Sequence, residues 1–322
     1  MLKAATGIQP KKHNLKGRHF LALADYSGEE IQYLLELASE IKAMHKQGRQ
    51  QPLLQGKVLG MIFEKSSTRT RVSFEAAMLQ LGGHAIFLSS KDIQLGRGES
   101  ISDTAKVLSR YVDGIMVRTF GHEKIESFAD SSSVPVINGL TDEHHPAQVL
   151  ADLLTIYEKK NKLKGLKLAY LGDGSNNMAH SLLEGAVKTG MDISIGCPES
   201  FSPLADIEAA ARAEAEISGS KVVIEHNPAA AVSEADVVVT DVWTSMGQEE
   251  EEQKRFSILS PYQVNEKLCR YAKKDFMFLH CLPAHRGEEV TADIIDGPHS
   301  HVFDEAENRL HAQKAVLTAL LS

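Results

Sequence analysis

Val58-Leu59-Gly60-Met61-Ile62-Phe63 is an apolar run that passes directly into the polar turn Glu64-Lys65-Ser66-Ser67-Thr68-Arg69-Thr70-Arg71. The run is short and ends at polar residues, which predicts a buried strand. The residues that follow predict a helix over Arg69–Leu81 that stops at Gly82-Gly83, because glycine commonly ends helices. The stretch therefore reads as a strand–turn–helix unit, from which parallel sheets are built.

The same alternation continues through the chain. Helical patterns, including Gly28–Gln47, Ser102–Ser109 and Pro146–Lys159, separate most of the short apolar runs. This predicts an α/β protein with two domains, each a parallel β-sheet flanked by helices, joined by interdomain helices. Besides Val58–Phe63, the expected strands are Ala85–Leu88, Gly114–Val117, Val134–Asn138, Leu166–Leu171, Asp192–Gly196, Lys221–Glu225, Val237–Asp241, Phe276–His280 and His301–Phe303.

The length of the chain sets the number of domains. Its 322 residues are about twice a typical domain of roughly 150 residues. The polar run Lys159–Gly165 marks the expected boundary, so the helix from Pro146 connects the domains. We expect residues 1–150, completed by a C-terminal helix of about residues 306–322, to form one domain and residues 151–305 the other.

Composition argues against several classes of protein. The formal net charge of −8 disfavours a nucleic-acid partner and means that an anionic substrate needs a local basic pocket. Three cysteines without a close pair or zinc spacing fit a reducing compartment. Met1–His19 lacks the apolar core of a signal peptide, and no apolar stretch is long enough to cross a membrane. We therefore expect a cytoplasmic protein without a membrane span.

The turn after Phe63 has the composition of an anion site. A helix N-terminus offers unpaired N–H groups and a partial positive charge. Ser67, Thr68 and Thr70 add hydroxyl donors, and Arg69 can bind a phosphate through two parallel hydrogen bonds. The alternative is an ordinary capped helix with surface arginines.

Ser67-Thr68-Arg69-Thr70 resembles the carbamoyl-phosphate motif Ser-x-Arg-Thr of the aspartate and ornithine carbamoyltransferases. The rest of the chain resembles the ornithine branch, in order and almost from end to end. The resemblance implies that Arg118, His145 and Gln148 surround the carbonyl and amino ends of the carbamoyl group. His144 offers the same chemistry, but the spacing to Pro146 favours His145.

Gly172-Asp173-Gly174-Ser175-Asn176-Asn177 follows an expected strand and partly matches a dinucleotide fingerprint. Asn177 stands where the third glycine is required, and no acidic residue follows at the expected distance. A nicotinamide dehydrogenase is therefore the weaker hypothesis. The segment resembles the family's ornithine-binding Asn-Asn turn, which implies a contact from Asn177, with Asn176 as the alternative.

Thr240–Glu249 resembles the Ser-Met-Gly loop that is typical of the ornithine branch. The resemblance implies that Asp241, Ser245 and Met246 bind ornithine, and an acidic residue suits a substrate with two amines. The charged run over Glu249–Arg255 is expected to be an exposed helix with i,i+4 ion pairs.

His280-Cys281-Leu282-Pro283 resembles the His-Cys-Leu-Pro signature of the same branch. Adjacent side chains on a strand point to opposite faces, so the histidine is a poor base for the cysteine and covalent catalysis is disfavoured. The resemblance implies that Cys281 and Asp241 orient the incoming amine. It also brings Cys281, Leu282 and the distant Arg309 to carbamoyl phosphate.

The resemblance implies an enzyme of arginine biosynthesis that carbamoylates the δ-amine of L-ornithine, giving L-citrulline, without a metal or cofactor. The first domain would bind carbamoyl phosphate and the second ornithine. Gln94 matches a family glutamine that reaches a neighbouring subunit, which implies a homotrimer or a multiple of trimers. The alternatives are a carbamoyltransferase for another amine, such as putrescine, and a non-catalytic homologue that binds carbamoyl phosphate. The implied catalytic residues are Arg118, His145, Asp241 and Cys281.

Overall fold

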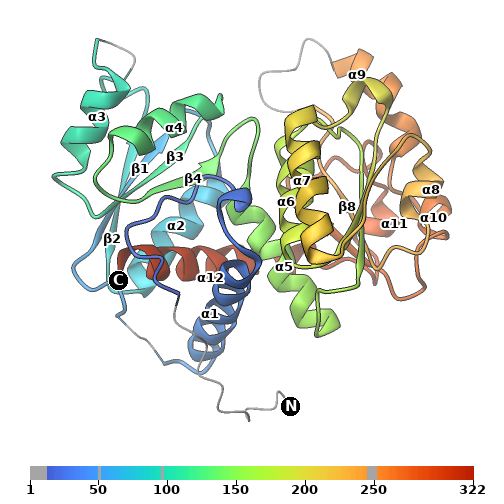
Figure 1. Cartoon of the computed structure of the whole chain (residues 1–322), viewed down its shortest axis with the longest axis horizontal. Helices are drawn as coiled ribbons and strands as arrows, with labels where there is room; N and C mark the ends of the chain where they lie inside the picture. Colours follow the sequence, from blue (N-terminus) through green and yellow to red (C-terminus); the bar gives the residue numbers. More distant parts are fainter. Residues whose placement is uncertain (1–12, 50–51, 96–97, 245–251) are drawn as a thin grey trace.

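The computed structural model describes residues 13–49, 52–95, 98–244 and 252–322. Its strands form two sheets, ordered β2-β1-β3-β4 and β7-β6-β5-β8-β9, in which neighbouring strands are parallel (Figure 1). The predicted fold class is therefore confirmed. The strands are β1 Val58–Phe63, β2 His84–Ser89, β3 Gly114–Arg118, β4 Val136–Leu140, β5 Lys167–Leu171, β6 Asp192–Gly196, β7 Val222–Glu225, β8 Val237–Thr240 and β9 Met277–His280.

Nine of the ten expected strands form, and the tenth is wrong. β4 begins two residues later than expected, directly after Pro135, because proline has no N–H to donate to a neighbouring strand. His301–Phe303 is instead the start of the terminal helix, and Ser300 just before it forms an isolated bridge with Phe278. An apolar run of three residues cannot distinguish a strand from a helical turn.

Helices cover both sheets, and several begin at the hydroxyl or amide side chains that cap helices best. Ser27 caps α1, Ser67 caps α2 and Asn176 caps α6. The helices are α1 Gly28–Lys46, α2 Thr68–Gln80, α3 Ile101–Leu108, α4 His122–Ser131, α5 Pro146–Lys160, α6 Asn177–Lys188, α7 Ala205–Ser218, α8 Pro228–Val232, α9 Glu252–Leu259, α10 Glu266–Cys269, α11 Ala292–Ile295 and α12 Val302–Leu321, with short 3-10 turns at Leu23–Asp25, Glu199–Phe201 and Ser260–Tyr262.

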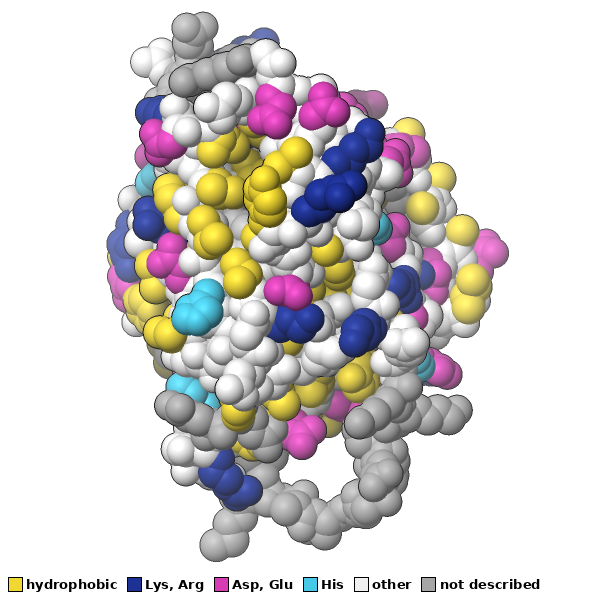
Figure 2. Space-filling model, turned by 90° about the vertical axis from the view of Figure 1, so that its left-hand side faces the viewer, with side chains coloured by type: hydrophobic (Ala, Val, Ile, Leu, Met, Phe, Trp, Pro, Cys, Tyr) yellow, Lys and Arg dark blue, Asp and Glu magenta, His cyan; other side chains and the backbone are white. Residues whose placement is uncertain are grey.

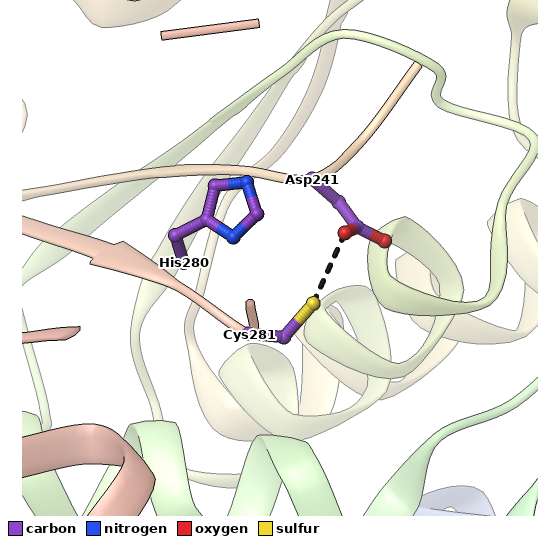
Figure 3. A group of neighbouring side chains, drawn as sticks. All are labelled: Asp241, His280 and Cys281. Carbon is purple, nitrogen blue, oxygen red and sulfur yellow. Dashed lines mark hydrogen bonds between the residues drawn. The ribbon is translucent and has the colours of Figure 1, made fainter. Parts of the chain in front are cut away.

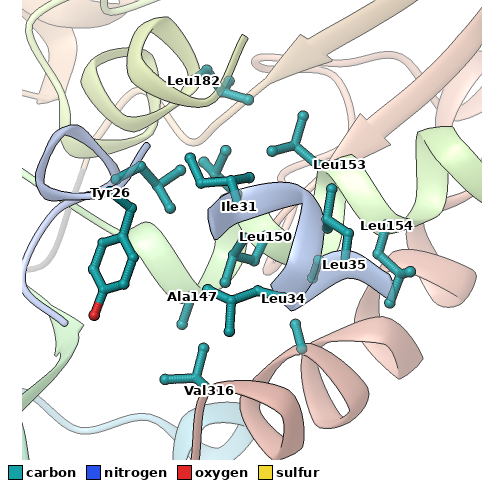
Figure 4. Close-up of a cluster of buried hydrophobic side chains, with 14 of the residues drawn as sticks. Tyr26, Ile31, Leu34, Leu35, Ala147, Leu150, Leu153, Leu154, Leu182 and Val316 are labelled. Atoms are coloured by element: carbon teal, nitrogen blue, oxygen red, sulfur yellow. The ribbon is translucent and has the colours of Figure 1, made fainter. Parts of the chain in front are cut away.

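Helix α5 holds the two halves of the molecule together. All residues from Pro146 to Ile156 are buried, which is typical of a helix that packs on every side. It contacts α1 and α12 of the first half and α6 of the second. Figure 4 shows Leu150 and Leu153 within one apolar cluster that includes Leu34 of α1 and Leu182 of α6. The core is therefore continuous between the two sheets.

The strand order places the ligand-binding edges of both sheets. The order reverses between β1 and β3 in one sheet and between β5 and β8 in the other. Open parallel sheets bind ligands at such points, beyond the carboxyl ends of the strands. Among the described helices, none combines the length and apolar character needed to cross a bilayer.

Candidate active site

A cavity of about 700 Å³ is lined by loops that follow strands of both sheets. On one side are the loops after β1, β3 and β4, and on the other those after β5, β8 and β9. The structure thus joins segments that are far apart in the sequence. The predicted site residues that line it are Ser67, Thr68, Arg69, Arg118, His145, Asn177, Asp241, Cys281, Leu282 and Arg309.

Five predicted site residues do not line this cavity in the structure, or lie outside what it describes. Gln148 is fully buried in α5, outside the cavity wall. Gln94 is exposed on the loop after β2 and is not part of the cavity lining. Ser245 and Met246 lie outside the described residues. Thr70, a fifth predicted residue, is also buried just outside the wall.

The first wall of the cavity is the N-terminus of α2. Ser67 Oγ accepts the Thr70 N–H at 3.2 Å and so fixes the first turn of the helix. Thr68 and Arg69 line the cavity next to this turn. The Arg69 guanidinium donates to the Leu282 carbonyl, which ties α2 to the loop after β9. The expected helix N-terminus therefore faces the cavity together with a cation.

Three guanidinium groups converge on the cavity. The Nε atoms of Arg69, Arg118 and Arg309 are buried without a hydrogen-bond partner among the described residues. Burial, reinforced by Arg309 and Arg69, lowers the pKa of Arg118 to about 10, and burial likewise lowers the pKa of Arg309 to about 10. Buried donors are normally satisfied, so three unsatisfied ones on adjacent cations indicate an anion site.

His145 precedes the first residue of α5, at the edge of the same cation cluster. Its backbone N–H donates to Ser181 Oγ at 2.8 Å, and Pro146 follows at the first helical position. Burial, followed by the charges of the three arginines, holds the pKa of His145 well below its usual value. The imidazole is therefore neutral at pH 7. Its Nδ1 has no hydrogen-bond partner among the described residues.

His144 points to the other side of the loop, away from this cavity. It lines a second cleft together with His122 and Glu184, and its Nδ1 lies 3.3 Å from Glu184 Oε1. Burial lowers the pKa of His144 to about 3. The geometry therefore favours His145 over His144 as the histidine of the main cavity.

Asp241 and Cys281 meet across the strand ends of the second sheet. The Cys281 thiol donates to Asp241 Oδ1 over an Sγ–Oδ1 distance of 3.0 Å (Figure 3). Burial and then the neighbouring carboxylate raise the pKa of Cys281 well above its usual value. Burial also raises the pKa of Asp241. Cys281 is therefore a neutral thiol that donates a hydrogen bond, and not a nucleophilic thiolate.

His280 is not a base for Cys281. Its Nδ1 accepts the Leu282 N–H at 2.9 Å, and its Nε2 lies 3.2 Å from Glu289 Oε1. Asp241, His280 and Cys281 could bring three metal-ligand atoms within 4.8 Å of one another. Each of the three already makes a hydrogen bond in the structure, His280 with Leu282 and Glu289 and Cys281 with Asp241.

The two residues of the Asn-Asn turn, Asn176 and Asn177, make different contacts. Asn176 caps α6 through Ala179 N–H at 2.9 Å, and its Nδ2 donates to the Tyr170 hydroxyl at 2.8 Å. Asn177 Nδ2 donates to the Thr141 carbonyl at 2.7 Å. Both asparagines line the cavity, but Asn176 has its carbonyl and amide groups occupied. The choice of Asn177 as the ligand contact stays a prediction.

Sequence reasoning missed two ion pairs in the cavity wall. Lys65 pairs with Asp142, and Arg255 pairs with Asp173. Arg255 is buried, so its expected place on an exposed helix is wrong. Its partner lies 82 residues away along the chain, and no local charge pattern reveals such a contact.

These pairs leave a simple distribution of charge. Among the described residues that line the cavity, Asp142 and Asp173 are neutralised by cations, whereas Asp241 has no ion-pair partner. Arg69, Arg118 and Arg309 likewise form no ion pair within the described part of the chain. The described residues of the cavity therefore offer a strongly cationic end and a single unpaired carboxylate. They suit one anionic ligand and one ligand with an amine.

Two family models together match nearly the whole chain. The carbamoyl-P binding domain of aspartate/ornithine carbamoyltransferase matches residues 18–158, and the Asp/Orn binding domain matches residues 164–320. Both matches agree with the resemblance carried by the sequence motifs.

Individual relatives are similar over their full length. The chain is 60% identical over 307 residues to ornithine carbamoyltransferase of Anoxybacillus flavithermus, covering 95% of this chain and 98% of that protein. Identity to the Bacillus subtilis enzyme of the same name is 60%, covering 96% and 95%. The solved ornithine carbamoyltransferase from Pyrococcus furiosus superposes with a TM-score of 0.94 at 54% identity, covering 96% and 98%. The chain belongs to the aspartate/ornithine carbamoyltransferase family.

Proposed function

We propose that the chain transfers the carbamoyl group of carbamoyl phosphate to the δ-amine of L-ornithine, giving L-citrulline and phosphate. The observation that carries this proposal is the convergence of Arg69, Arg118 and Arg309, with buried unpaired donors, on the cavity that Asp241 also lines. The names of the relatives, ornithine carbamoyltransferase in each case, favour ornithine over aspartate.

The cationic end suits the charge that develops in the reaction. Carbamoyl phosphate carries a phosphate group, and attack on its carbonyl carbon moves negative charge onto the carbonyl oxygen and the leaving phosphate. Charge-assisted hydrogen bonds contribute about 1.5–3 kcal/mol each, so fixed guanidinium groups can lower the barrier substantially. In the proposed arrangement Arg69, Arg309 and the first turn of α2 hold the phosphate, while Arg118 and His145 face the carbonyl oxygen.

The other end of the cavity suits the incoming amine. A lysine-like ammonium has a reference pKa of about 10.4, so deprotonation at pH 7 costs roughly 4–5 kcal/mol. Asp241 and Cys281 would orient the amine, and Asn177 together with Ser245 and Met246 would bind the rest of ornithine. The neutral Cys281 thiol serves as a hydrogen-bonding group and forms no covalent intermediate.

The division of substrates between the halves is part of the proposal. Residues 1–150 with the C-terminal helix of about residues 306–322 would bind carbamoyl phosphate, and residues 151–305 would bind ornithine. In support, α12 packs against α1, α2 and α5 and carries Arg309 to the cavity.

We further propose a homotrimer, or a multiple of trimers, in the cytoplasm, acting in arginine biosynthesis. The edge strand β2 and the helix beside it expose Val72, Leu79 and Ile86. Figure 2 shows hydrophobic side chains gathered on this side of the molecule. Exposed apolar patches mark interaction surfaces, and Gln94 follows β2 on an exposed loop. Gln94 would then reach the carbamoyl phosphate of a neighbouring subunit.

Citrulline formation tests the activity directly. The purified chain is incubated with carbamoyl phosphate and either L-ornithine, putrescine or L-aspartate, and each carbamoylated product is measured. We expect turnover with ornithine and little with the other two. Turnover with putrescine alone contradicts the choice of amine, and carbamoyl-phosphate binding without turnover contradicts the assignment as an enzyme.

The shared site has its own test. The variants Gln94→Ala and Arg69→Ala are each expected to be inactive. The two are mixed, dissociated into subunits and reassembled. Partial recovery of activity is expected, because some interfaces then combine an intact Gln94 with an intact Arg69. If activity does not recover although trimers reform, the site is not shared.

A further inference from the structure

Two buried carboxyl groups lie against the cation cluster and have no place in the scheme above. Asp152 of α5 and Glu305 of α12 are 0% and 1% exposed. They lie one helical turn from two proposed ligand contacts, since Asp152 follows Gln148 by four residues and Glu305 precedes Arg309 by four. Residues at this spacing share a helix face, so the pair sits beneath the carbamoyl-phosphate end of the cavity.

The pair fixes the amide of Gln148. Gln148 Nε2 donates to Asp152 Oδ1 at 2.8 Å and to Glu305 Oε1 at 2.8 Å. The amide nitrogen therefore lies between the two carboxyl groups, each of which accepts from it. The carbonyl oxygen, Oε1, is then turned away from them. It is buried without a hydrogen-bond partner among the described residues.

The unsatisfied oxygen has the chemistry of a ligand acceptor. A buried acceptor without a partner is destabilising, and buried polar atoms are normally satisfied. Gln148 lies one turn from His145, whose carbonyl accepts the Gln148 N–H at 3.1 Å. His145 lines the cavity. The amino group of a carbamoyl moiety is a donor, and it would satisfy this oxygen.

The same pair is tied to the strand end that carries Cys281. Glu305 Oε2 accepts the His280 N–H at 2.8 Å. Burial, followed by the charge of Asp152, raises the pKa of Glu305 well above its usual value, and burial raises the pKa of Asp152 to about 7. The pair therefore does not carry two full negative charges at neutral pH.

We propose that Asp152 and Glu305 are positioning residues that hold the Gln148 amide with its oxygen toward the amino group of carbamoyl phosphate. The inference rests on the proposed function, since it assigns the orientation of the same substrate. Neither residue touches the substrate. Their effect is transmitted through Gln148 and through the backbone of His280.

The test compares carbamoyl phosphate with inorganic phosphate, which has no amino group. For each variant, kcat/KM for carbamoyl phosphate and the inhibition constant of phosphate are measured. Asp152→Leu keeps the side-chain size but removes the acceptor. We expect kcat/KM to fall about 10- to 100-fold, the cost of a misplaced reacting group. The inhibition constant of phosphate should stay within about twofold of the wild-type value.

Two amide substitutions provide a matched contrast. In Asp152→Asn the new oxygen can accept from Gln148 while the new nitrogen donates to Glu305. Most of the kcat/KM that Asp152→Leu loses should therefore be retained. In Glu305→Gln one of two oxygens that accept N–H groups becomes a nitrogen, so the loss should persist. This contrast decides the question even if Asp152→Leu does not fold.

Two results would overturn the inference. One is an inhibition constant of phosphate that rises in step with the loss of kcat/KM, because that result indicates general damage to the cavity. The other is an Asp152→Asn variant as impaired as Glu305→Gln. If the wild-type chain itself makes no citrulline, the proposed function fails; if only the contrast is missing, the positioning role fails.

Discussion

Arg309 Nη2 donates to Thr70 Oγ1 at 2.9 Å, although 239 residues separate them in the sequence. Thr70 belongs to the first turn of α2 and Arg309 to α12. Ser67 Oγ donates to the same threonine oxygen at 3.1 Å. This contact holds the C-terminal helix against the helix N-terminus that faces the cavity. It leaves Arg309 Nε buried without a partner among the described residues.

Replacing Arg309 should weaken carbamoyl-phosphate binding. A charge-assisted hydrogen bond contributes about 1.5–3 kcal/mol, so Arg309→Ala should raise the dissociation constant about 10- to 150-fold. Isothermal titration calorimetry measures the dissociation constant of carbamoyl phosphate. Arg286→Ala is the control, because Arg286 is exposed and pairs with Asp296. Equal binding by both variants would place Arg309 outside the anion site.

Arg69 and Asp241 should affect different substrates. Arg69 belongs to the cationic end and Asp241 is the unpaired carboxylate. We expect Arg69→Ala to raise the KM for carbamoyl phosphate at least about 10-fold, and Asp241→Ala to act chiefly on ornithine. Steady-state kinetics with each substrate varied in turn separates the effects. If both variants weakened ornithine alone, the proposed division of substrates would be wrong.

Activity should rise into the alkaline range. The attacking amine has a reference pKa of about 10.4, so its neutral fraction grows about tenfold per pH unit below that value. His145 stays neutral throughout, because its pKa is well below the usual value. A flat kcat/KM for ornithine between about pH 6 and 9 contradicts attack by the amine.

Cys281 should resist alkylation until Asp241 is changed. Burial and the neighbouring carboxylate raise the pKa of the thiol, so little reactive thiolate exists near neutral pH. Asp241→Asn removes the negative charge, which lowers the pKa and should accelerate iodoacetamide labelling severalfold. Mass spectrometry at Cys281 measures the rate, with the buried Cys197 and Cys269 as internal references. Unchanged labelling would mean that Asp241 does not control the thiol.

Local pattern was enough to predict most of the fold. The apolar run before Ser67 and the polar turn after it gave β1 and α2 nearly to the residue. Arg118, the last residue of β3, and Asp241, directly after β8, could each be placed at the carboxyl edge of a parallel sheet, where ligands bind. That these edges of two different sheets meet at one cavity was implied by the family resemblance alone. The sequence therefore predicts which residues lie at the carboxyl ends of the strands.

Contacts between helices that are distant in the sequence could not be predicted. Whether Thr70 and Gln148 line the cavity or lie behind it depends on how α12 packs, which no local period specifies. The Arg255–Asp173 pair likewise joins segments 82 residues apart. The burial of Asp152 beside Glu305 contradicts the usual exposure of acidic residues, and it emerges only when α5 and α12 are brought together.

Truncating the shared core should cost stability across the whole chain. Leu153 lies on α5, is 0% exposed and packs in the cluster that joins α1, α5 and α6 (Figure 4). Leu153→Ala removes buried methyl groups and leaves a cavity, a change that costs about 2–5 kcal/mol. Denaturant unfolding at two wavelengths measures it, with Ile217→Ala, 82% exposed on α7, as the control. Because α5 contacts both halves, the loss should lower a single common transition. If one half unfolded alone while the other kept its wild-type midpoint, the core would not couple the two sheets.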